Sequence, residues 1–480
     1  MSNKPNLPKG TRDFSPIEMV RRNYIFDTIK KVFKKYGFQQ IETPAMENLE
    51  TLVRTGGEES DKLIFKILDS GDYPDKVDWK KFLEHYDVNN IDDSVKIDTR
   101  EFTKDISSKA LHYDLTVPFA RYVVQHQNDI TFPFRRFQIQ PVWRADKPQK
   151  GRYREFYQCD VDSIGSNSLL NEVDLIKIID DVFTKLFKRK LNYTIVINNR
   201  KILQGIVESV GEQDKFEQIV VIIDKFDKIG RIGIVKELIN IGLNENVAEI
   251  LIQLCNIKAY DEALDKINFN ENLKVASEQL EYLSNKISGF HNGEKGVEEL
   301  EFVFEKLTQL GLKTANVIFD PTLARGLGYY TGTIIEVKVD NFPSICGGGR
   351  YDDLTGKFGL KDVSGVGVSF GADRIYDVLL DNNLYPEFKG DSTQVLFTNQ
   401  SKEDEERFLP ILFKLRDKGI NAELYTEQAK WQKQLIFAEK KRIKFIVSTN
   451  ENGDLFVKEM DGTEKKPFSS IEELITIIRK

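Results

Sequence analysis

The chain has few cysteines and histidines, and neither residue occurs in a metal-binding pattern. Its three cysteines, Cys159, Cys255 and Cys346, lie far apart, and no C-x-x-C pair occurs among the 480 residues. Structural zinc sites and disulfide frameworks need closely spaced or paired cysteines, so the sequence argues against both and favours a reducing compartment. The four histidines form no recognisable triad or metal motif. We therefore expect His112 to be structural and assign no metal ligand.

Long apolar runs and an excess of positive charge are also missing. No run approaches the roughly 18 residues that a membrane span needs, and residues 1–16 contain no apolar segment of the secretory type. We therefore expect a cytoplasmic protein without a membrane partner. The formal net charge of −7 argues against broad, non-specific binding of nucleic acid. A polynucleotide partner would have to be bound by local basic patches.

The common glycine-rich nucleotide motifs are absent too. No GxxxxGK[ST] segment occurs, and GVGVSFG at residues 365–371 has one residue too many between its last two glycines for a dinucleotide fingerprint. Glycines 347–349 alone are more typical of a tight turn. A nucleotide site in this chain would have to be built from other residues.

What the sequence does contain is a basic segment, residues 134–162, that indicates two strands joined by a loop. Residues 133–155 hold seven lysines and arginines against two acids. One interpretation is a solvated surface loop, because charge alone is common there. The other is a nucleotide site, since Arg144 follows an apolar strand-like run and Phe156 follows the turn. A fixed guanidinium binds phosphate oxygens, and an aromatic ring stacks on a base.

Two further arginines lie beside glycine or aromatic residues, Arg325 in LARGLGYY and Arg374 in FGADR. Together with Arg144 they could neutralise a triphosphate and stabilise the charge that develops at phosphorus. That chemistry depends on positioning and electrostatics and needs no side-chain base. The set favours nucleotidyl transfer over hydrolysis by a catalytic triad.

The periodicity of the chain indicates an α+β fold. Residues 15–36 predict a helix with Ile25, Ile29, Val32 and Phe33 on one face, and a short strand, 37–41, follows. Residues 69–108 indicate an elaborated connection. In the mostly helical region 201–316, Val247, Ile250, Leu251 and Leu254 recur at i, i+3, i+4 and i+7. Strand-forming segments on both sides of that region indicate one interrupted mixed sheet. The last 90 residues alternate strands and helices, which is typical of a small α/β domain.

Ordered segments of the chain resemble the histidyl-tRNA synthetase family of class II aminoacyl-tRNA synthetases. They are KGTRDFSP (9–16) with GFQQIETP (37–44), YDLTVPFARY (113–122), the basic segment 134–162, LARGLGYYTG (323–332) and GVGVSFGADRI (365–375). The resemblance implies a mixed, mostly antiparallel sheet as the catalytic core, a helical insertion and a C-terminal anticodon-binding domain. We accordingly expect four regions: core 1–200, insertion 201–316, core 317–386 and anticodon-binding domain 392–480. It also implies a homodimer formed through residues 15–44.

The activity implied by this resemblance has two steps. L-histidine and ATP form histidyl-adenylate and diphosphate, and the histidyl group then moves to the 3′-terminal ribose of tRNA-His, releasing AMP. By the same resemblance, Arg144 clamps the α-phosphate and the substrate carboxylate, opposite a second catalytic arginine, Arg325. Arg374 holds the triphosphate tail, Phe156 stacks on adenine and Asp146 contacts ATP. Mg²⁺ bridges the phosphates and keeps several waters, so few protein ligands are expected.

The resemblance also implies a histidine site. Asp114, Thr116 and Gln158 match residues that hold the α-amino group, and Asp162 and Tyr330 match those that contact the imidazole. A carboxylate and a phenol pair both ring nitrogens and reject side chains that lack them. Arg325 and Tyr329 complete the predicted set. Two positions depart from the family pattern: Gly328, where an acid or amide is common, and Asp373, where glutamate is common.

Two lysine-rich segments are candidate contacts with tRNA. The resemblance places Lys147, Lys150 and Arg152 near the acceptor stem, and the anticodon-binding domain carries Lys430, Lys433, Lys440 and Lys441. An exposed helix face explains the second group equally well. An alternative function is a synthetase-like regulatory subunit that binds histidine or a partner enzyme without charging tRNA. Such paralogues usually lack the C-terminal domain and some of the arginines, whereas this chain has both.

Overall fold

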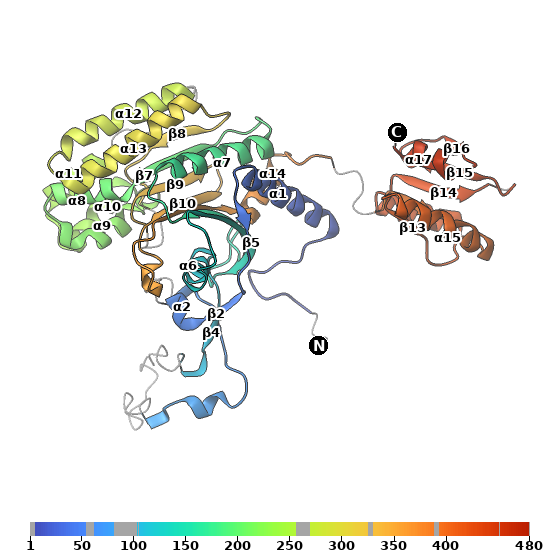
Figure 1. Ribbon diagram of the computed structural model, residues 1–480, viewed down its shortest axis with the longest axis horizontal. Helices are drawn as coiled ribbons and strands as arrows, with labels where there is room; N and C mark the ends of the chain where they lie inside the picture. The colour runs from blue at the N-terminus through green and yellow to red at the C-terminus, as the bar shows by residue number, and fades with distance from the viewer. Residues whose placement is uncertain are drawn as a thin grey trace. The chain divides into compact units, whose positions relative to one another are not determined.

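The computed structural model describes residues 5–53, 62–80, 103, 105–255, 269–324, 330–387, 393–450 and 452–479 (Figure 1). The chain divides into two compact units. The first comprises Met1–Asp13 and Arg22–Leu384, and the second Phe14–Arg21 and Tyr385–Lys480. Most of the predicted connection 69–108 lies outside the described residues. Within the described residues, no helix is both long and apolar enough to cross a lipid bilayer.

The first unit is built on an eight-stranded sheet in the order β1-β5-β6-β11-β10-β9-β7-β8. Its central strands are antiparallel, while β1 runs parallel to β5 and β8 parallel to β7. Strands that precede and follow the helical region share this sheet, which confirms the predicted fold class. The strands are β1 (Gln39–Gln40), β5 (Phe134–Trp143), β6 (Glu155–Ile164), β7 (Thr194–Asn199), β8 (Asn316–Phe319), β9 (Thr333–Lys338), β10 (Cys346–Tyr351) and β11 (Gly365–Gly371).

The two faces of this sheet are covered differently. Helices α1 (Pro16–Lys35) and α7 (Leu170–Phe187) lie over one face (Figure 1). There, the rings of Phe33 and Phe183 pack on Phe370 of β11 at centroid distances of 5.7 and 5.6 Å. Helix α6 (Thr116–Gln125) lies on the other face, where the Arg136 guanidinium stands 4.1 Å from the Phe119 ring centroid. The second face therefore carries polar groups as well as apolar ones.

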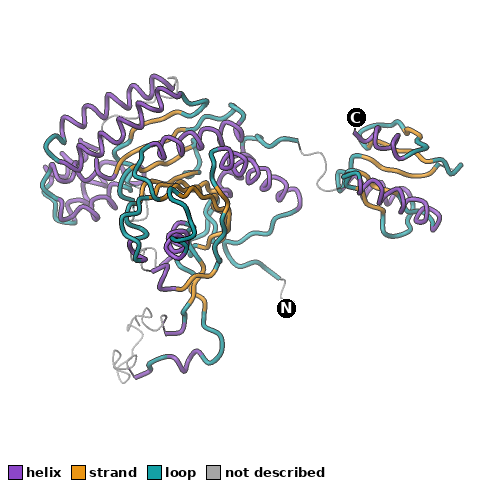
Figure 2. Tube along the Cα trace, in the orientation of Figure 1, coloured by secondary structure: helices purple, strands orange, loops and turns teal. Residues whose placement is uncertain are grey.

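A block of helices lies between β7 and β8 in the chain (Figure 2). In α11 the buried residues are Ala248, Leu251, Ile252 and Cys255, whereas Ile250 is exposed. The predicted stripe was thus wrong: the buried face is shifted by one residue along the helix, because Ala248 and Cys255 also pack into the core. The predicted stripe in α1 is confirmed. The helices are α8 (Arg200–Ser209), η2 (Gln213–Lys215), α9 (Phe216–Ile223), α10 (Phe226–Asn240), α11 (Glu245–Cys255), α12 (Phe269–Lys286) and α13 (His291–Leu310).

A small three-stranded sheet, in the order β2-β4-β3, stands next to the start of α6. Leu49 and Leu52 of α2 pack with Val117 of α6 in one hydrophobic cluster. The smaller elements of this unit are β2 (Met46–Asn48), α2 (Leu49–Val53), β3 (Lys66–Ile67), η1 (Tyr73–Lys76), β4 (Lys109–Leu111), η4 (Gly356–Phe358) and α14 (Ala372–Asp381).

The second unit has its own five-stranded sheet, in the order β13-β12-β14-β15-β16. Phe397, Phe408 and Val447 form part of its core. The alternation predicted for residues 394–459 is confirmed, but β16 was not predicted, because its Lys-Lys-Pro sequence is fully exposed and has no apolar alternation. The elements are β12 (Val395–Phe397), α15 (Lys402–Asp417), β13 (Ala422–Leu424), α16 (Trp431–Lys440), β14 (Phe445–Thr449), β15 (Leu455–Glu459), β16 (Lys465–Pro467) and α17 (Ile471–Arg479).

Candidate active site

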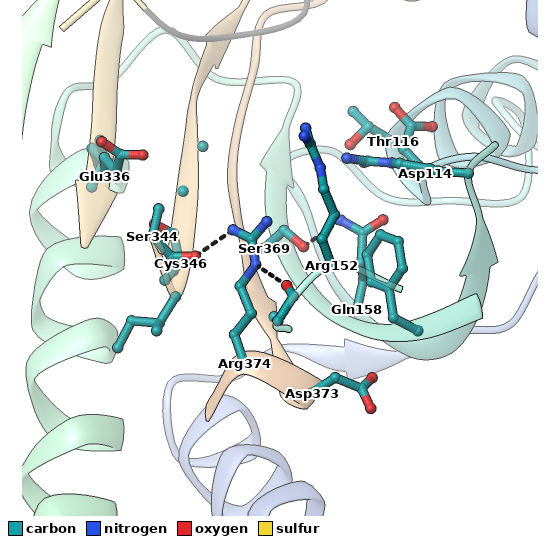
Figure 3. Close-up of a pocket in the computed structure, with 18 of the residues that line it drawn as sticks. Asp114, Thr116, Arg152, Gln158, Glu336, Ser344, Cys346, Ser369, Asp373 and Arg374 are labelled. Atoms are coloured by element: carbon teal, nitrogen blue, oxygen red, sulfur yellow. Dashed lines mark hydrogen bonds between the residues drawn. The ribbon is translucent and has the colours of Figure 1, made fainter. Parts of the chain in front are cut away.

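A cavity of about 370 Å³ opens on the sheet face opposite α1 and α7 (Figure 3). Its walls come from the β5–β6 hairpin, the start of α6, and strands β9, β10 and β11. The cavity brings together residues from four separate motifs of the sequence. Those singled out by the sequence are Asp114, Thr116, Arg144, Asp146, Arg152, Phe156, Gln158, Tyr330 and Arg374.

Glycines hollow out the sheet at this point. Gly349 of β10 faces Gly367 of β11, and Gly347 faces Ser369. A Cβ atom on Gly367 would lie 2.0 Å from Asp162 Oδ1, and one on Gly349 would lie 2.5 Å from the Thr333 carbonyl oxygen. Residues 347–349 therefore form a strand beneath the cavity, and their interpretation as a tight turn was wrong.

Two guanidinium groups are fixed at the cavity by main-chain carbonyls. Arg144 follows β5 directly; its Nε donates to the Tyr113 carbonyl at 2.9 Å, and its guanidinium lies 5.4 Å from the Phe156 ring centroid. Arg374, in the first turn of α14, donates to the carbonyls of Gly151 at 3.1 Å and Ser344 at 2.5 Å. A main-chain carbonyl orients a guanidinium without adding a negative charge, which suits a cavity that binds an anionic ligand.

Buried acceptors gather among the strands on the same side of the sheet. Asp114 Oδ1 accepts from the Val117 amide at 3.1 Å, but its Oδ2 accepts no hydrogen bond from the described residues. The same is true of Gln158 Oε1 and Asp160 Oδ1. A buried polar atom without a partner costs about 1–3 kcal/mol. Three such acceptors indicate a ligand that is rich in hydrogen-bond donors.

Burial also shifts the titration of these carboxylates. Desolvation raises the pKa of Asp114 to about 6, against the opposing effect of the Val117 amide and of the Arg144 and Arg136 charges. Desolvation likewise raises the pKa of Asp160 and of Asp162, and Arg136 opposes it in both cases. Carboxylates perturbed in this way next to a cavity are typical of functional sites.

The two predicted imidazole contacts lie on opposite sides of the glycine pair. Tyr330 lines the cavity beside Gly349. Asp162 is buried next to Gly367; its Oδ1 accepts from the Tyr351 hydroxyl at 2.6 Å, and its Oδ2 lies 3.0 Å from Arg136 Nη2. Asp162 is thus held behind the cavity floor by a phenol and a guanidinium.

Several residues of this region were not predicted from the sequence. Ser369 and Glu336 line the cavity, and Arg136 and Asp160 are buried behind it. The feature that groups them is the strand register: Arg136 faces Asp162, and Asp160 faces Ser369. The sequences of the separate strands do not show how the strands pair, so these residues carried no signal in the sequence.

The remaining predicted residues are placed as follows. Arg325, Tyr329 and Gly328 lie outside the described residues. Asp373, one of the two departures from the family pattern, is buried and accepts from the Tyr157 amide at 2.8 Å. It also forms ion pairs with Arg22, at 2.6 Å, and with Arg12. Asp373 therefore ties the N-terminal segment and α1 to the hairpin behind the site.

The lysine-rich segments are at the surface of their respective units. Lys147, Lys150 and Arg152 are exposed on the hairpin loop; Lys150 pairs with Asp381 at 2.9 Å, and Arg152 lies 3.5 Å from Asp146. In the second unit, the predicted patch is exposed along α16 and at its ends. Its members are Lys430, Lys433, Lys440 and Lys441, of which Lys433 and Lys441 pair with Glu427 and Glu423.

Comparison with known proteins agrees with this arrangement. The family model described as "Histidyl-tRNA synthetase" matches residues 10–73 and 83–375. A histidine–tRNA ligase of Phocaeicola vulgatus is 48% identical over 486 aligned positions, covering 100% of both chains. One from Christiangramia forsetii is 50% identical over 456 positions, covering 94% of this chain and 93% of the relative.

Solved structures show the same fold. A histidyl-tRNA synthetase from Nostoc sp. PCC 7120 superimposes with a TM-score of 0.77 at 29% identity, over 99% of this chain and 98% of that one. An "ATP phosphoribosyltransferase regulatory subunit/histidyl-tRNA synthetase" from Bacillus halodurans gives a TM-score of 0.69 at 19% identity, over 93% and 99%, which shows the fold alone. The family match over most of the length, together with relatives near 50% identity, shows that the chain belongs to the histidyl-tRNA synthetase family.

Proposed function

We propose that the chain activates L-histidine with ATP, forming histidyl-adenylate and diphosphate, and then transfers the histidyl group to the 3′-terminal ribose of tRNA-His, releasing AMP. The observation that carries this proposal is the polarity of the cavity. Arg144 and Arg374 supply cations for the phosphates, whereas Asp114 and Gln158 supply buried acceptors for the donors of an amino acid. One cavity therefore suits both substrates.

The first step needs charge stabilisation at the α-phosphorus. The Arg144 guanidinium clamps the α-phosphate and the incoming carboxylate, and Arg374 holds the triphosphate tail. The Phe156 ring, whose centroid lies 5.4 Å from the Arg144 guanidinium, covers the adenine, and Asp146 contacts ATP. An oxygen of the histidine carboxylate attacks the α-phosphorus while diphosphate leaves. Arg325 is the second catalytic arginine of this proposal.

The second part of the proposal concerns the amino acid. The α-ammonium group donates to Asp114 Oδ2 and Gln158 Oε1, beside Thr116, and so satisfies acceptors that are otherwise without a partner. Asp162 and Tyr330 contact the imidazole from the two sides of the glycine pair, with Tyr329 nearby in sequence. A site that hydrogen-bonds both ring nitrogens discriminates strongly against other side chains.

Mg²⁺ fits this site as an ion held by the substrate. The described residues contain no group of three or more histidine, cysteine, aspartate or glutamate side chains that could hold a metal by itself. An ion that bridges ATP phosphates and keeps its waters needs few protein ligands. When bound, it would neutralise negative charge on the ATP phosphates.

The polymer contacts and the assembly are also part of the proposal. Lys147, Lys150 and Arg152 approach the acceptor stem, and the α16 patch of the second unit contacts the anticodon region. Two copies associate through residues 15–44 as a homodimer. The protein acts in the cytoplasm, where tRNA is charged.

The test is ATP–diphosphate exchange with each of the twenty amino acids, followed by charging of tRNA-His. We expect exchange that depends on histidine and a stable histidyl-tRNA product. Exchange that histidine does not stimulate would contradict the activation step. Binding of histidine without any tRNA charging would instead support the regulatory-subunit alternative.

A further inference from the structure

A chain of three polar side chains runs along the edge of the cavity from β6 to β11. Gln158 and Asp160 are two residues apart on β6 and so point to the same sheet face. Ser369 of β11 faces Asp160 directly. Gln158 Nε2 donates to Ser369 Oγ at 2.6 Å, and the Ser369 hydroxyl, which faces Asp160 across the strands, lowers the pKa of the Asp160 carboxyl group. Figure 3 shows Gln158 and Ser369 in the cavity wall.

We propose that Ser369 and Asp160 are positioning residues that hold the Gln158 carboxamide with its nitrogen toward β11 and its oxygen toward the ligand. The inference rests on the proposed function, because it takes the α-ammonium group of histidine as the donor that this oxygen accepts. It explains how an uncharged side chain is made selective for an ammonium group.

The argument starts from the symmetry of a carboxamide. Its two ends have nearly the same shape but opposite hydrogen-bonding character, so an unconstrained Gln158 could present either. An ionised Asp160 can only accept, and it takes the single proton of the Ser369 hydroxyl. The Ser369 oxygen can then only accept from Gln158, which must turn its nitrogen toward it. Gln158 Oε1 is left as a buried acceptor without a partner among the described residues.

The surroundings of Asp160 decide whether it remains an acceptor. Burial and the neighbouring Asp162 and Asp114 carboxylates raise its pKa, while the Arg136 charge and the Ser369 hydroxyl lower it. Arg136 is completely buried, and its Nε and Nη1 have no hydrogen-bond partner among the described residues, so its charge acts in a dry environment. At pH 8, Asp160 is in its ionised, carboxylate form.

The hydrogen-bond chain Asp160–Ser369–Gln158 is called the relay below. Three variants of the full-length chain test it: Ser369→Ala, Ser369→Thr and Asp160→Asn. Calorimetry at pH 8 measures the Kd for histidine, for histidinol, which keeps the amino group, and for imidazolepropionate, which lacks it. We expect Ser369→Ala to weaken histidine and histidinol about tenfold, the effect of one hydrogen bond to a charged group. Imidazolepropionate binding should be unchanged, and Ser369→Thr, which keeps the hydroxyl, should retain wild-type affinity.

Asp160→Asn probes the direction of the relay. Its amide can donate to the Ser369 oxygen, which frees the hydroxyl proton for Gln158 Oε1 and turns the Gln158 nitrogen toward the ammonium group. We expect it to weaken histidine at least as much as Ser369→Ala does, again without an effect on imidazolepropionate. Unchanged thermal melting and ATP affinity in each variant would confirm an intact fold.

Two results would overturn the relay alone. One is histidine binding by the wild type that Ser369→Ala and Asp160→Asn leave intact, and the other is an equal loss for imidazolepropionate, which indicates a general packing effect. Wild-type protein that bound no histidine would overturn the proposed function, and the ligand of the relay with it.

Discussion

Asp114 shows that the proposed histidine site contains a buried carboxylate that lowers the stability of the folded protein. Its side chain is buried, one of its oxygens has no donor among the described residues, and its pKa rises from 3.8 to about 6. A carboxyl group whose pKa is higher in the folded than in the unfolded state destabilises the folded state at every pH at which it is ionised. Binding of an ammonium group would remove this cost.

Replacing Asp114 with asparagine should therefore stabilise the ligand-free protein while impairing histidine activation. The raised pKa means that the ionised carboxylate lowers the free energy of unfolding, by about 3 kcal/mol at pH 8, where the effect is complete. The reduction falls to roughly half at pH 5, as the folded state takes up its proton. Thermal melting of Asp114→Asn should thus exceed that of wild type at pH 8 and approach it at pH 5.

The exposed Asp340→Asn is the matched control, with no comparable gain at either pH. Histidine-dependent ATP–diphosphate exchange by Asp114→Asn should fall sharply, because the amide no longer offers a charged partner to the ammonium group. A gain in melting temperature that is the same at pH 5 and pH 8 would contradict the assignment to ionised Asp114.

Strands β10 and β11 shape the site through their glycines, because a side chain at most of these positions would collide with neighbouring atoms. Gly367→Ala should displace Asp162 and destabilise the protein, because the new methyl group would lie 2.0 Å from Asp162 Oδ1 and 2.9 Å from the Val161 carbonyl oxygen. Gly347→Ala is the matched control in the neighbouring strand. Its methyl group would lie no closer than 3.4 Å to a neighbour, the Ile335 carbonyl oxygen, on the face that bears the cavity.

Thermal melting and the KM values for histidine and ATP separate the two effects. We expect Gly367→Ala to lower the melting temperature and raise the KM for histidine, since Asp162 must move. Gly347→Ala should melt like wild type and show at most a change in substrate KM through the smaller cavity. Equal stability of the two variants would argue against a close contact between Gly367 and Asp162.

These strands also show what could be predicted from the sequence. Periodicity and turn residues gave the bounds of β8 and β11, and motif residues such as Arg144 and Gln158 do lie in one cavity. Asp160 and Ser369 were missed because their pairing depends on the register between two strands about 200 residues apart in sequence. The run 347–349 was misread, since a glycine that makes room for a ligand looks the same in sequence as one that makes a turn.

At the scale of the whole molecule, the candidate active site lies in one of the two units, and the other unit is a separately folded body. The cavity and all its described residues belong to the first unit. The second unit has its own sheet and two hydrophobic clusters, one of them built on Val395, Phe397, Phe408 and Phe445. Units with separate cores can fold and act separately.

Truncation of the chain before residue 390 should therefore leave histidine-dependent ATP–diphosphate exchange near the wild-type rate while charging of tRNA-His falls steeply. Activation needs only residues of the first unit, whereas tRNA affinity depends in this proposal on the basic patch of α16. Full-length protein with Lys430→Glu and Lys440→Glu is the control that reverses two charges of the patch and keeps the second unit. It should show part of the charging defect and leave histidine-dependent exchange unchanged. Because phosphate contacts dominate such affinity, the KM for tRNA of wild type should also rise with salt more steeply than that of this variant. Loss of exchange in the truncated protein, with its fold intact by thermal melting, would show instead that the second unit supports the catalytic cavity.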